Sequence, residues 1–286
     1  DNPWLLNIRK LNYKPNKYRN DIKLKIDGRY ESDKNYFWLN EKGKPGKVLK
    51  IIKEDKLKSF CRFTGAYIAE GHITFNRVNK NWYVGISNGD KKWLEGLESD
   101  LKTFYDGNYW YIRHKKEGFK DVWELQIKSR LLYNLFRKLL GENSETKKLP
   151  NWFSQIKKEY LLEIWGKMLE GDGCIDKKGG FRYTTKSYKL ACQLSWLFTS
   201  LKYDYTVCEE KNNSYSYWHF RECISYQPDQ GNSAKKIEWI DYNNWVYDIT
   251  VDGVHNFTVG VGNIVVHNSH VKVSFDMPEY TANTDA

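Results

Sequence analysis

Two short stretches decide the fold, FTGAYIAEGHI at residues 63–73 and WGKMLEGDGCI at residues 165–175. Each carries a carboxylate directly before a glycine at the expected end of a helix, Glu70 in the first stretch and Asp172 in the second. If the two helices pack side by side, these carboxylates meet at one end and repel each other unless a cation lies between them. Divalent cations bind carboxylate oxygens readily, and such a site can activate water and stabilise phosphodiester cleavage.

The same order of predicted elements occurs twice between residues 55 and 226. Apolar residues at helical and alternating spacing predict a helix, two strands, a second helix and two more strands in each copy. The first copy comprises Asp55–Glu70, Ile73–Val78, Trp82–Ile86, Lys91–Phe104, Tyr109–His114 and Asp121–Ile127, followed by a helix over Arg130–Leu140. The second comprises Lys157–Glu170, Cys174–Asp176, Phe181–Thr184, Tyr188–Leu201, Tyr205–Glu209 and Tyr215–Cys223. This repetition predicts an α+β, pseudo-twofold domain whose leading helices meet at the axis.

The two acidic stretches resemble the paired motifs of the LAGLIDADG homing endonucleases. Two further segments resemble motifs of that family, KKLPNWF at residues 147–153 and YTTKSYKLA at residues 183–191. The resemblance implies an αββαββα domain over residues 55–228, with a saddle of strands that binds double-stranded DNA. It also implies that Glu70 and Asp172 bind Mg²⁺, and that Lys147 supports the transition state of DNA cleavage.

One position departs from this pattern. Gly65 and Gly71 are six residues apart in the first stretch, but Lys167 stands six residues before Gly173 in the second, with Gly166 displaced by one. A lysine at a close helix crossing must point its stem outward, or the helices must separate. The alternative is therefore that the two acids only cap helix ends in a degenerate nuclease domain. We expect nearby His72 to be a local polar residue rather than a metal ligand.

A second group of chemically reactive residues is the tripeptide His267-Asn268-Ser269. The Asn268 amide can attack its own backbone carbonyl, close a succinimide and release the next residue, and a neighbouring histidine can supply the proton. The Ser269 hydroxyl could receive an acyl group transferred from elsewhere. The tripeptide by itself is also compatible with an ordinary surface turn.

The sequence before this tripeptide favours the chemical interpretation. The segments VYDITVDGVHNFTV at 246–259 and NIVVHNS at 263–269 closely resemble the two C-terminal splicing motifs of inteins. The resemblance implies that Asn268 cyclises with the help of His267, and that Ser269 begins the downstream host segment. It further implies that His255 assists proton transfer and that Asp248 orients or activates the serine. Alternatively, Asp248 only caps a turn.

The resemblance divides the remaining chain among the parts of an intein. Residues 229–268 are expected to form the C-terminal segment of an all-β, Hint-type (horseshoe) splicing domain, and residues 269–286 the start of the C-extein. Residues 1–54 are expected to contribute part of the splicing domain and a linker. Both N-terminal splicing motifs are absent from the sequence, which indicates either a truncated precursor or a split intein. The split form, which we favour slightly, would splice in trans with a complementary N-terminal intein fragment.

Composition agrees with a folded protein that binds a polyanion. The formal net charge is +10 and aromatic residues make up 16% of the chain, a combination that suits contact with phosphates and bases. Nothing in the sequence predicts a membrane span or a signal peptide. None of the five cysteines has the spacing of a zinc site, so we expect small, mostly buried side chains in a reducing, intracellular and cytoplasmic setting.

A different class of function also fits these patterns. The chain could be a free-standing homing endonuclease, or a DNA-binding protein, with a C-terminal β docking module. The two hypotheses differ in whether the Asn268–Ser269 bond is cleaved.

Overall fold

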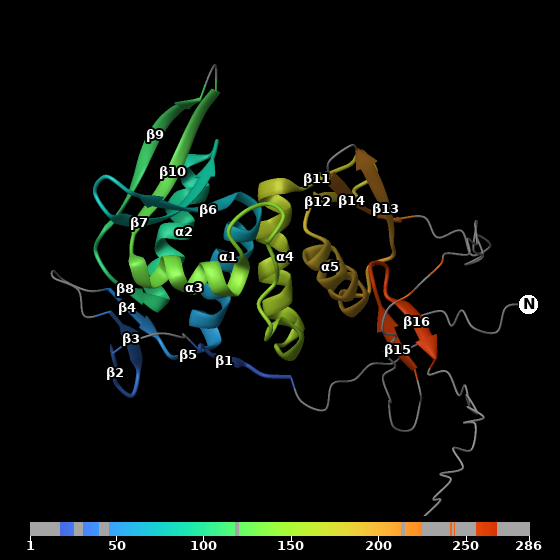
Figure 1. Cartoon of the computed structure of the whole chain (residues 1–286), viewed down its shortest axis with the longest axis horizontal. Helices are drawn as coiled ribbons and strands as arrows, with labels where there is room; N and C mark the ends of the chain where they lie inside the picture. Colours follow the sequence, from blue (N-terminus) through green and yellow to red (C-terminus); the bar gives the residue numbers. More distant parts are fainter. Residues whose placement is uncertain are drawn as a thin grey trace, which may run out of the picture.

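Two long helices lie side by side at the centre of the computed structural model, α1 (Glu54–Glu70) and α4 (Lys158–Asp172) (Figure 1). They are the predicted leading helices of the two copies, and each ends at its carboxylate with the following glycine as C-cap. The structure describes residues 18–25, 31–39, 46–117, 120–212, 215–224, 241, 243 and 256–267.

The first copy has the predicted αββαββα order. Its elements after α1 are β6 (Gly71–Asn76), β7 (Asn81–Asn88), α2 (Lys91–Phe104), β9 (Trp110–Glu117), β10 (Lys120–Lys128) and α3 (Arg130–Leu140). The four strands form an antiparallel sheet in the order β6-β7-β10-β9. A two-residue strand that the sequence did not predict, β8 (Tyr105–Asp106), follows α2.

The second copy repeats this topology. After α4 come β11 (Cys174–Ile175), β12 (Phe181–Thr185), α5 (Tyr188–Leu201), β13 (Tyr205–Asn212) and β14 (Tyr215–Glu222). They pair antiparallel in the order β11-β12-β14-β13, which matches the order of the first sheet strand for strand. The mixed α and β architecture and its internal duplication therefore agree with the prediction.

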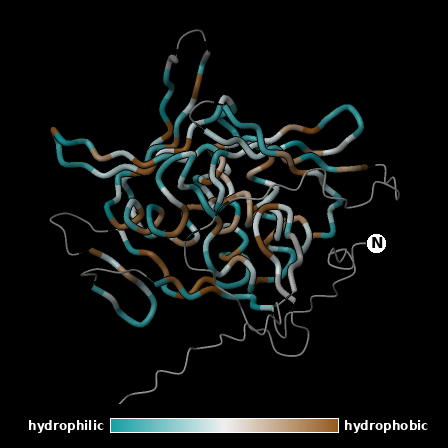
Figure 2. Tube along the Cα trace, turned by 45° about the vertical axis from the view of Figure 1, so that its right-hand side comes forward, coloured by the Kyte–Doolittle hydropathy of each residue, from teal (hydrophilic) through white to brown (hydrophobic). Residues whose placement is uncertain are grey.

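Sequence features explain where these helices begin and what they bury. Side chains of Asp90, Ser129 and Ser187 accept hydrogen bonds from backbone N–H groups in the first turns of α2, α3 and α5, which satisfies donors that have no partner inside the helix. Between the helices lies an apolar core, and hydrophobic stretches recur along the central helices (Figure 2). Phe63 of α1 contacts Phe104 and Phe136 in the first copy.

The N-terminal strands extend the first copy. Strand β1 (Asp21–Lys23) pairs with β5 (Ile51–Lys53), and a separate sheet runs β2 (Glu31–Ser32), β3 (Tyr36–Trp38), β4 (Lys47–Leu49) and β8. Residues 18–53 thus pair, where they are described, with one another, with β8 and, through Arg19, with Ile156 before α4. Their assignment to the splicing domain stays a prediction.

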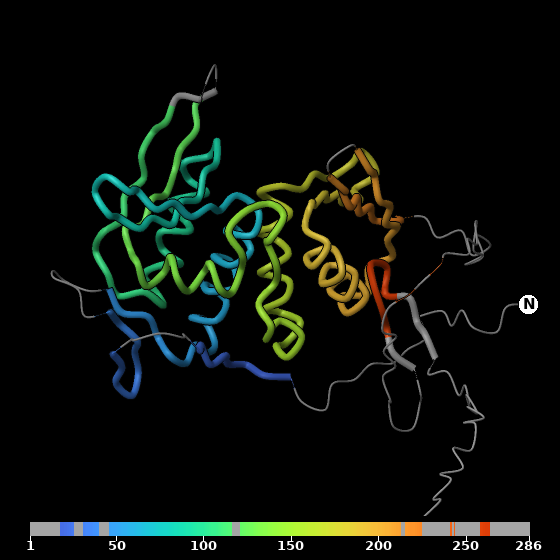
Figure 3. Tube along the Cα trace, in the orientation of Figure 1, coloured from blue at the N-terminus to red at the C-terminus, as the bar shows by residue number. Residues whose placement is uncertain are grey.

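A hairpin of β15 (Asn256–Val259) and β16 (Ile264–His267) lies beside α5 (Figures 1 and 3). Short apolar runs punctuated by glycines predict four strands in the C-terminal splicing segment, Ile237–Ile240, Val246–Val251, Phe257–Val259 and Ile264–Val266. The hairpin contains the last two, and the first two lie outside the described residues, as does the expected C-extein. A complete Hint-type domain is accordingly not part of the described fold.

Several details differ from the sequence predictions. Strand β6 ends at Asn76 rather than Val78, because the Asn76 side chain accepts hydrogen bonds from Val78 N and Asn79 N and so closes a turn. All five cysteines are free, but Cys174 and Cys208 are exposed, so the expectation of burial was wrong for these two. Their strands place them on the face of the sheet away from the helices. Among the described residues, no helix has the length and apolarity required to cross a membrane.

Candidate functional site

The structure brings Glu70 and Asp172 together at neighbouring ends of α1 and α4. A Cβ atom added to Gly171, the residue before Asp172, would lie 3.1 Å from Glu70 Cγ and 2.6 Å from the Ala69 Cβ. The last turns of the two helices therefore touch, and only a glycine allows this approach. The predicted meeting of the two carboxylates is thus present in the fold, whereas their catalytic role stays a prediction.

Lys147 belongs to the same cluster. It lies in the segment between the two copies, is buried, and donates a hydrogen bond from Nζ to the Ala69 carbonyl oxygen at 2.8 Å. Its ammonium group also lies 5.7 Å from the ring centroid of Tyr67. The long-range contact with Ala69 places the lysine one residue from Glu70, a proximity that sequence spacing alone could not show.

The electrostatics of this cluster show an unbalanced negative charge. Burial, and then the negative charge of Asp172, raise the pKa of Glu70 to about 7, against the opposing effect of Lys147. Burial also raises the pKa of Asp172. Burial lowers the pKa of Lys147 to about 8, although both carboxylates favour its charged form. Two carboxylates thus face one cation, and a further cation would relieve their repulsion.

The donor set of this cluster fits a hard divalent cation. Carboxylate oxygens are the ligands that Mg²⁺ and Ca²⁺ prefer, and Mg²⁺ often uses only one or two of them together with water and substrate phosphates. Within the described ranges, no group of three or more His, Cys, Asp or Glu side chains is placed to hold a metal ion. A metal at this pair would consequently depend on water and DNA phosphates for its remaining ligands.

Lys167 does not force the central helices apart. A Cβ added to Gly65 of α1 would lie 2.2 Å from the Ile164 carbonyl oxygen and 3.0 Å from the Lys167 Cβ, so Gly65 provides the space at this crossing. A Cβ added to Gly166 would lie within 4 Å of no neighbouring atom, so Gly166 does not contribute to the close crossing of the helices. The departure from the glycine pattern is therefore compatible with close helix packing.

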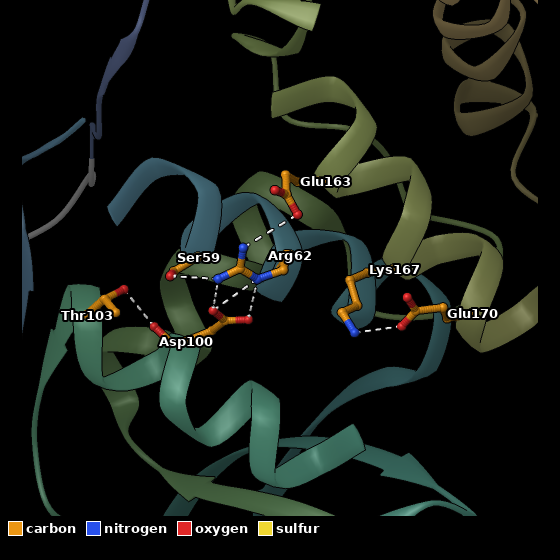
Figure 4. A network of polar contacts seen from close by, with 7 residues as sticks. All are labelled: Ser59, Arg62, Asp100, Thr103, Glu163, Lys167 and Glu170. Atoms are coloured by element: carbon orange, nitrogen blue, oxygen red, sulfur yellow. Dashed lines mark hydrogen bonds and ion pairs between the residues drawn. The ribbon is translucent and has the colours of Figure 1, made fainter. Parts of the chain in front are cut away.

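The head of Lys167 points away from the crossing, as the sequence argument required for close packing. Its Nζ forms an ion pair with Glu170 Oε2 at 2.6 Å (Figure 4) and lies 5.3 Å from the ring centroid of Trp93 in α2. Trp93 Nε1 donates to the same Glu170 oxygen at 2.7 Å. The Lys167 ammonium group thus lies over an aromatic ring while its charge is neutralised by an exposed carboxylate.

A second polar network ties the same helices together away from the carboxylate pair. Arg62 of α1 donates from Nε to Asp100 Oδ2 of α2 at 2.9 Å. Its other guanidinium nitrogens donate to Ser59 of α1 and to Glu163 of α4 (Figure 4). One guanidinium group therefore links three helices. Because Arg62 binds acids on both neighbours, we assign it to the positioning of α1 rather than to the chemistry of the site.

The outer face of the first sheet carries charged residues that the sequence reasoning missed. Glu124 of β10 is fully buried beneath Arg113 and Lys115 of β9, at 2.7 and 2.8 Å, and it also contacts His72 of β6 at 3.1 Å. Burial alone would raise the pKa of Glu124, but these three hydrogen-bond donors outweigh it and hold the pKa at about 2. His72 is accordingly a local polar residue, as expected. Alternation along the strand could have placed both basic residues on one face.

The outer face of the second sheet is also basic. Arg182 of β12 and Arg221 of β14 are paired across the sheet, and both lie close to Asp176, at 3.8 and 3.5 Å. Nearby, Thr184 Oγ1 and His219 Nδ1 are hydrogen-bonded at 2.9 Å. Both sheets thus present cationic side chains on the face opposite the helices, as a surface for a polyanion requires.

Of the predicted splicing residues, the structure describes only the backbone of His267, the last residue of β16, which pairs with Asn256. Asp248, His255, Asn268 and Ser269 lie outside the described residues. The assembly of these five residues into one site therefore stays a prediction.

Comparison with known proteins gives relatives that are DNA polymerases. The DNA polymerase of Thermococcus hydrothermalis is 25% identical over a match that covers 77% of this chain and 16% of the polymerase. The DNA polymerase of Thermococcus kodakarensis is 22% identical with the same coverage, and its DNA polymerase II large subunit is 30% identical over 48% of this chain. The chain thus spans only 16% of the length of the first two relatives. No protein-family model matches it.

Solved structures with some similarity include homing endonucleases. A mesophilic variant of I-DmoI has a TM-score of 0.44 and 15% identity, and the match covers 60% of this chain and 91% of that chain. I-WcaI bound to its DNA recognition sequence has a TM-score of 0.37 and 12% identity, covering 58% and 75%.

Proposed function

We propose that this chain is a protein-splicing element that carries a site-specific, double-strand DNA endonuclease in its duplicated domain. The observation that carries the nuclease half is the contact between the ends of α1 and α4, which places Glu70 and Asp172 beside each other and beside Lys147. The observation that carries the splicing half is the tripeptide after β16, in the context of the two motif-like segments.

In the splicing half, Asn268 is the residue that breaks the chain. Its side-chain nitrogen attacks its own carbonyl carbon, and the bond to Ser269 nitrogen breaks as His267 supplies a proton to that leaving group. Before this step the Ser269 hydroxyl, activated by Asp248, attacks the acyl group carried on a side chain of the N-terminal fragment. The bond to that side chain breaks, and the side chain leaves with a proton that His255 helps to transfer. After Asn268 has cyclised, the acyl group moves from the Ser269 oxygen to its freed nitrogen and forms the new peptide bond. We further propose that a Hint-type β-domain holds these residues, and that a complementary N-terminal intein fragment completes it in trans.

Mass spectrometry tests the splicing half. The chain is mixed with the N-terminal splicing segment as a separate polypeptide, and we expect a ligated product and release at Asn268–Ser269. The variant Asn268→Ala should give neither. If neither product forms, or if Asn268→Ala behaves like the native chain, the chain is better described as a free-standing DNA-binding protein or endonuclease with a C-terminal docking module.

In the nuclease half, the two outer sheet faces bind the DNA backbone through cationic side chains such as Arg113 and Arg221. Glu70 and Asp172 would hold Mg²⁺, which when bound supplies Lewis-acid stabilisation and a more acidic water. Lys147 places a positive charge next to both carboxylates and stabilises charge that develops on the phosphate. The central position of this cluster between the two sheets suits cleavage of both strands.

Cleavage of a supercoiled plasmid that carries the uninterrupted host gene tests the nuclease half. We expect Mg²⁺-dependent linearisation by the native chain and its loss in the double variant Glu70→Gln, Asp172→Asn. The matched control is Glu170→Gln, which removes an exposed carboxylate from the same helix, two residues before Asp172, and should retain cleavage. Undiminished cleavage by the double variant would reject the assignment of these two residues.

A further inference from the structure

The turn of the C-terminal hairpin is anchored on α5 of the second copy. Gly262 N donates to Ser195 Oγ at 2.9 Å, and Asn263 Nδ2 donates to Thr199 Oγ1 at 3.0 Å. Ser195 and Thr199 are four residues apart and therefore lie on one face of the helix. Val261, directly before the two donors, also packs against the apolar core. Figure 3 shows this turn against α5.

The two helix hydroxyls are arranged as acceptors for the turn. Ser195 Oγ donates its own proton to the Ala191 carbonyl oxygen at 3.0 Å, and Thr199 Oγ1 donates to the Ser195 carbonyl oxygen at 2.9 Å. Because a hydroxyl has one proton and two lone pairs, each oxygen can then accept from the turn. Ser195 is fully buried and Asn263 nearly so, which makes these bonds costly to leave unmade.

The backbone of the turn fits this anchor. Asn263 has φ of +52° and Gly262 has φ of +91°, a left-handed region that glycine and asparagine adopt more readily than other residues. That conformation lets consecutive residues present a backbone N–H and a side-chain amide to the same helix. Asn263 thus serves both the conformation of the turn and its attachment.

The register of the hairpin connects this anchor to the splice junction. Val259 pairs with Ile264 at the turn, and Asn256 pairs with His267 at the open end. Four antiparallel pairs therefore join the anchored turn to the residue that precedes Asn268. A hairpin fixed at its turn restricts the positions that the backbone of His267 can occupy.

We infer that α5 of the endonuclease-like domain is a positioning element for C-terminal cleavage, acting through the hydroxyls of Ser195 and Thr199. This inference rests on the proposed splicing function, because it assigns α5 a role in that reaction. It makes the second copy a part of the splicing machinery as well as of the DNA-binding domain. Ser195 and Thr199 are positioning residues, since they act through the hairpin.

The experiment uses the full chain, with the complementary N-terminal intein fragment added for the cleavage arm, and has two readouts. These are amide hydrogen exchange of the hairpin and release of residues 269–286. In the double variant Ser195→Ala, Thr199→Val, we expect the Gly262 amide to exchange roughly fivefold faster, as the loss of one hydrogen bond predicts. Release of the C-terminal segment should slow by roughly the same factor or more. Thr199→Val preserves side-chain shape, so the core of α5 remains intact.

Two matched variants separate positioning from a general loss of structure. The single variant Thr199→Ser retains the accepting hydroxyl, so its amide exchange and its release of residues 269–286 should equal those of the native chain. Ser200→Ala removes a hydroxyl about 100° around the same helix and should alter neither readout.

Native exchange and native release in the double variant would overturn the inference. Faster exchange with unchanged release would overturn the positioning role and leave only a docking contact. If the native chain and Asn268→Ala both fail to release the segment, the proposed splicing function fails, and faster exchange in the double variant would still establish the anchor on α5.

Discussion

The two copies of the duplicated domain share one topology but arrange their charges differently. In the first, Glu124 lies fully buried beneath Arg113 and Lys115 on the outer sheet face. In the second, the acid beside the cationic side chains is Asp176, which follows β11 and lies close to the exposed Arg182 and Arg221. The shared strand order therefore does not depend on the outer face. It follows from the apolar residues that alternate on the inner face of each sheet.

The copies also differ in what is attached to them. The first is extended by the N-terminal strands and β8, and the second receives the C-terminal hairpin on α5. The leading helix with its terminal carboxylate, the second helix and the four-stranded sheet are common to both copies. The copies therefore share their central architecture and differ in the elements attached at the periphery.

The largest expected effect tests the crossing of the central helices. Gly65→Ala should lower the free energy of unfolding by about 3 kcal/mol, because the new Cβ would meet the Ile164 carbonyl oxygen in a packed core. Gly166→Ala on the partner helix is the control. It faces open space and should raise stability by roughly 0.5–1 kcal/mol. Urea unfolding midpoints measure both, and equal effects would contradict the assigned role of Gly65.

The next effect distinguishes the two outer faces. Glu124→Gln should lower the free energy of unfolding by about 2 kcal/mol at pH 7. This is less than the free energy that corresponds to the full pKa difference, because Arg113 and Lys115 are partly exposed. Since the folded-state pKa of about 2 is below the ordinary value, this stability is present above pH 4.5 and is lost as the pH falls towards 2.

Unfolding measured at pH 7 and pH 4 tests this sign, with Glu95→Gln as control. Glu95 forms an exposed i,i+4 ion pair with Lys91, so Glu95→Gln should lower the free energy of unfolding by less than about 0.5 kcal/mol. A cost for Glu124→Gln that grows at lower pH would contradict the buried network.

A smaller effect is expected at the carboxylate pair. The pKa of Glu70 is raised to about 7, so the favourable contribution of its protonated form is present below pH 4.5 and is lost as the pH rises through 7. Without divalent metal at pH 8, Glu70→Gln should therefore raise the free energy of unfolding by about 1 kcal/mol, discounted for partial exposure. The gain should disappear at pH 4.5.

Addition of Mg²⁺ tests whether the two carboxylates bind a divalent cation. Thermal melting at pH 8 should show that Mg²⁺ stabilises the native chain and has a smaller effect on Glu70→Gln. Equal stabilisation of both proteins would contradict metal binding at this pair.

The smallest effect concerns Lys167, the departure from the glycine pattern. Lys167→Met retains an unbranched stem and loses the ion pair with exposed Glu170, so we expect a change below about 1 kcal/mol. A loss as large as that of Gly65→Ala would show that the charge, rather than the glycine opposite, permits the close crossing. Urea unfolding again provides the measurement.

The duplicated order of elements was predictable from the sequence, because helical and alternating apolar spacing persists over whole elements. Helix α5 matches its predicted bounds, Tyr188–Leu201, and α1 differs by a single residue. The pairing of β4 with β8 was not predictable, since two-residue strands are too short to show a period. The network around Glu124 was missed for a related reason. A strand pattern shows which residues share a face, but not which charge is covered by its neighbours.

At the candidate site, sequence determined the residue types and tertiary structure determined their distances. A carboxylate before a glycine at the end of two similar helices was enough to single out Glu70 and Asp172. Only the fold brings Lys147 to the Ala69 carbonyl and shows that Gly65, rather than Gly166, makes room for Lys167. The physical reason is that local propensities act over a few residues, whereas helix contacts and buried charges depend on packing between segments far apart in the chain.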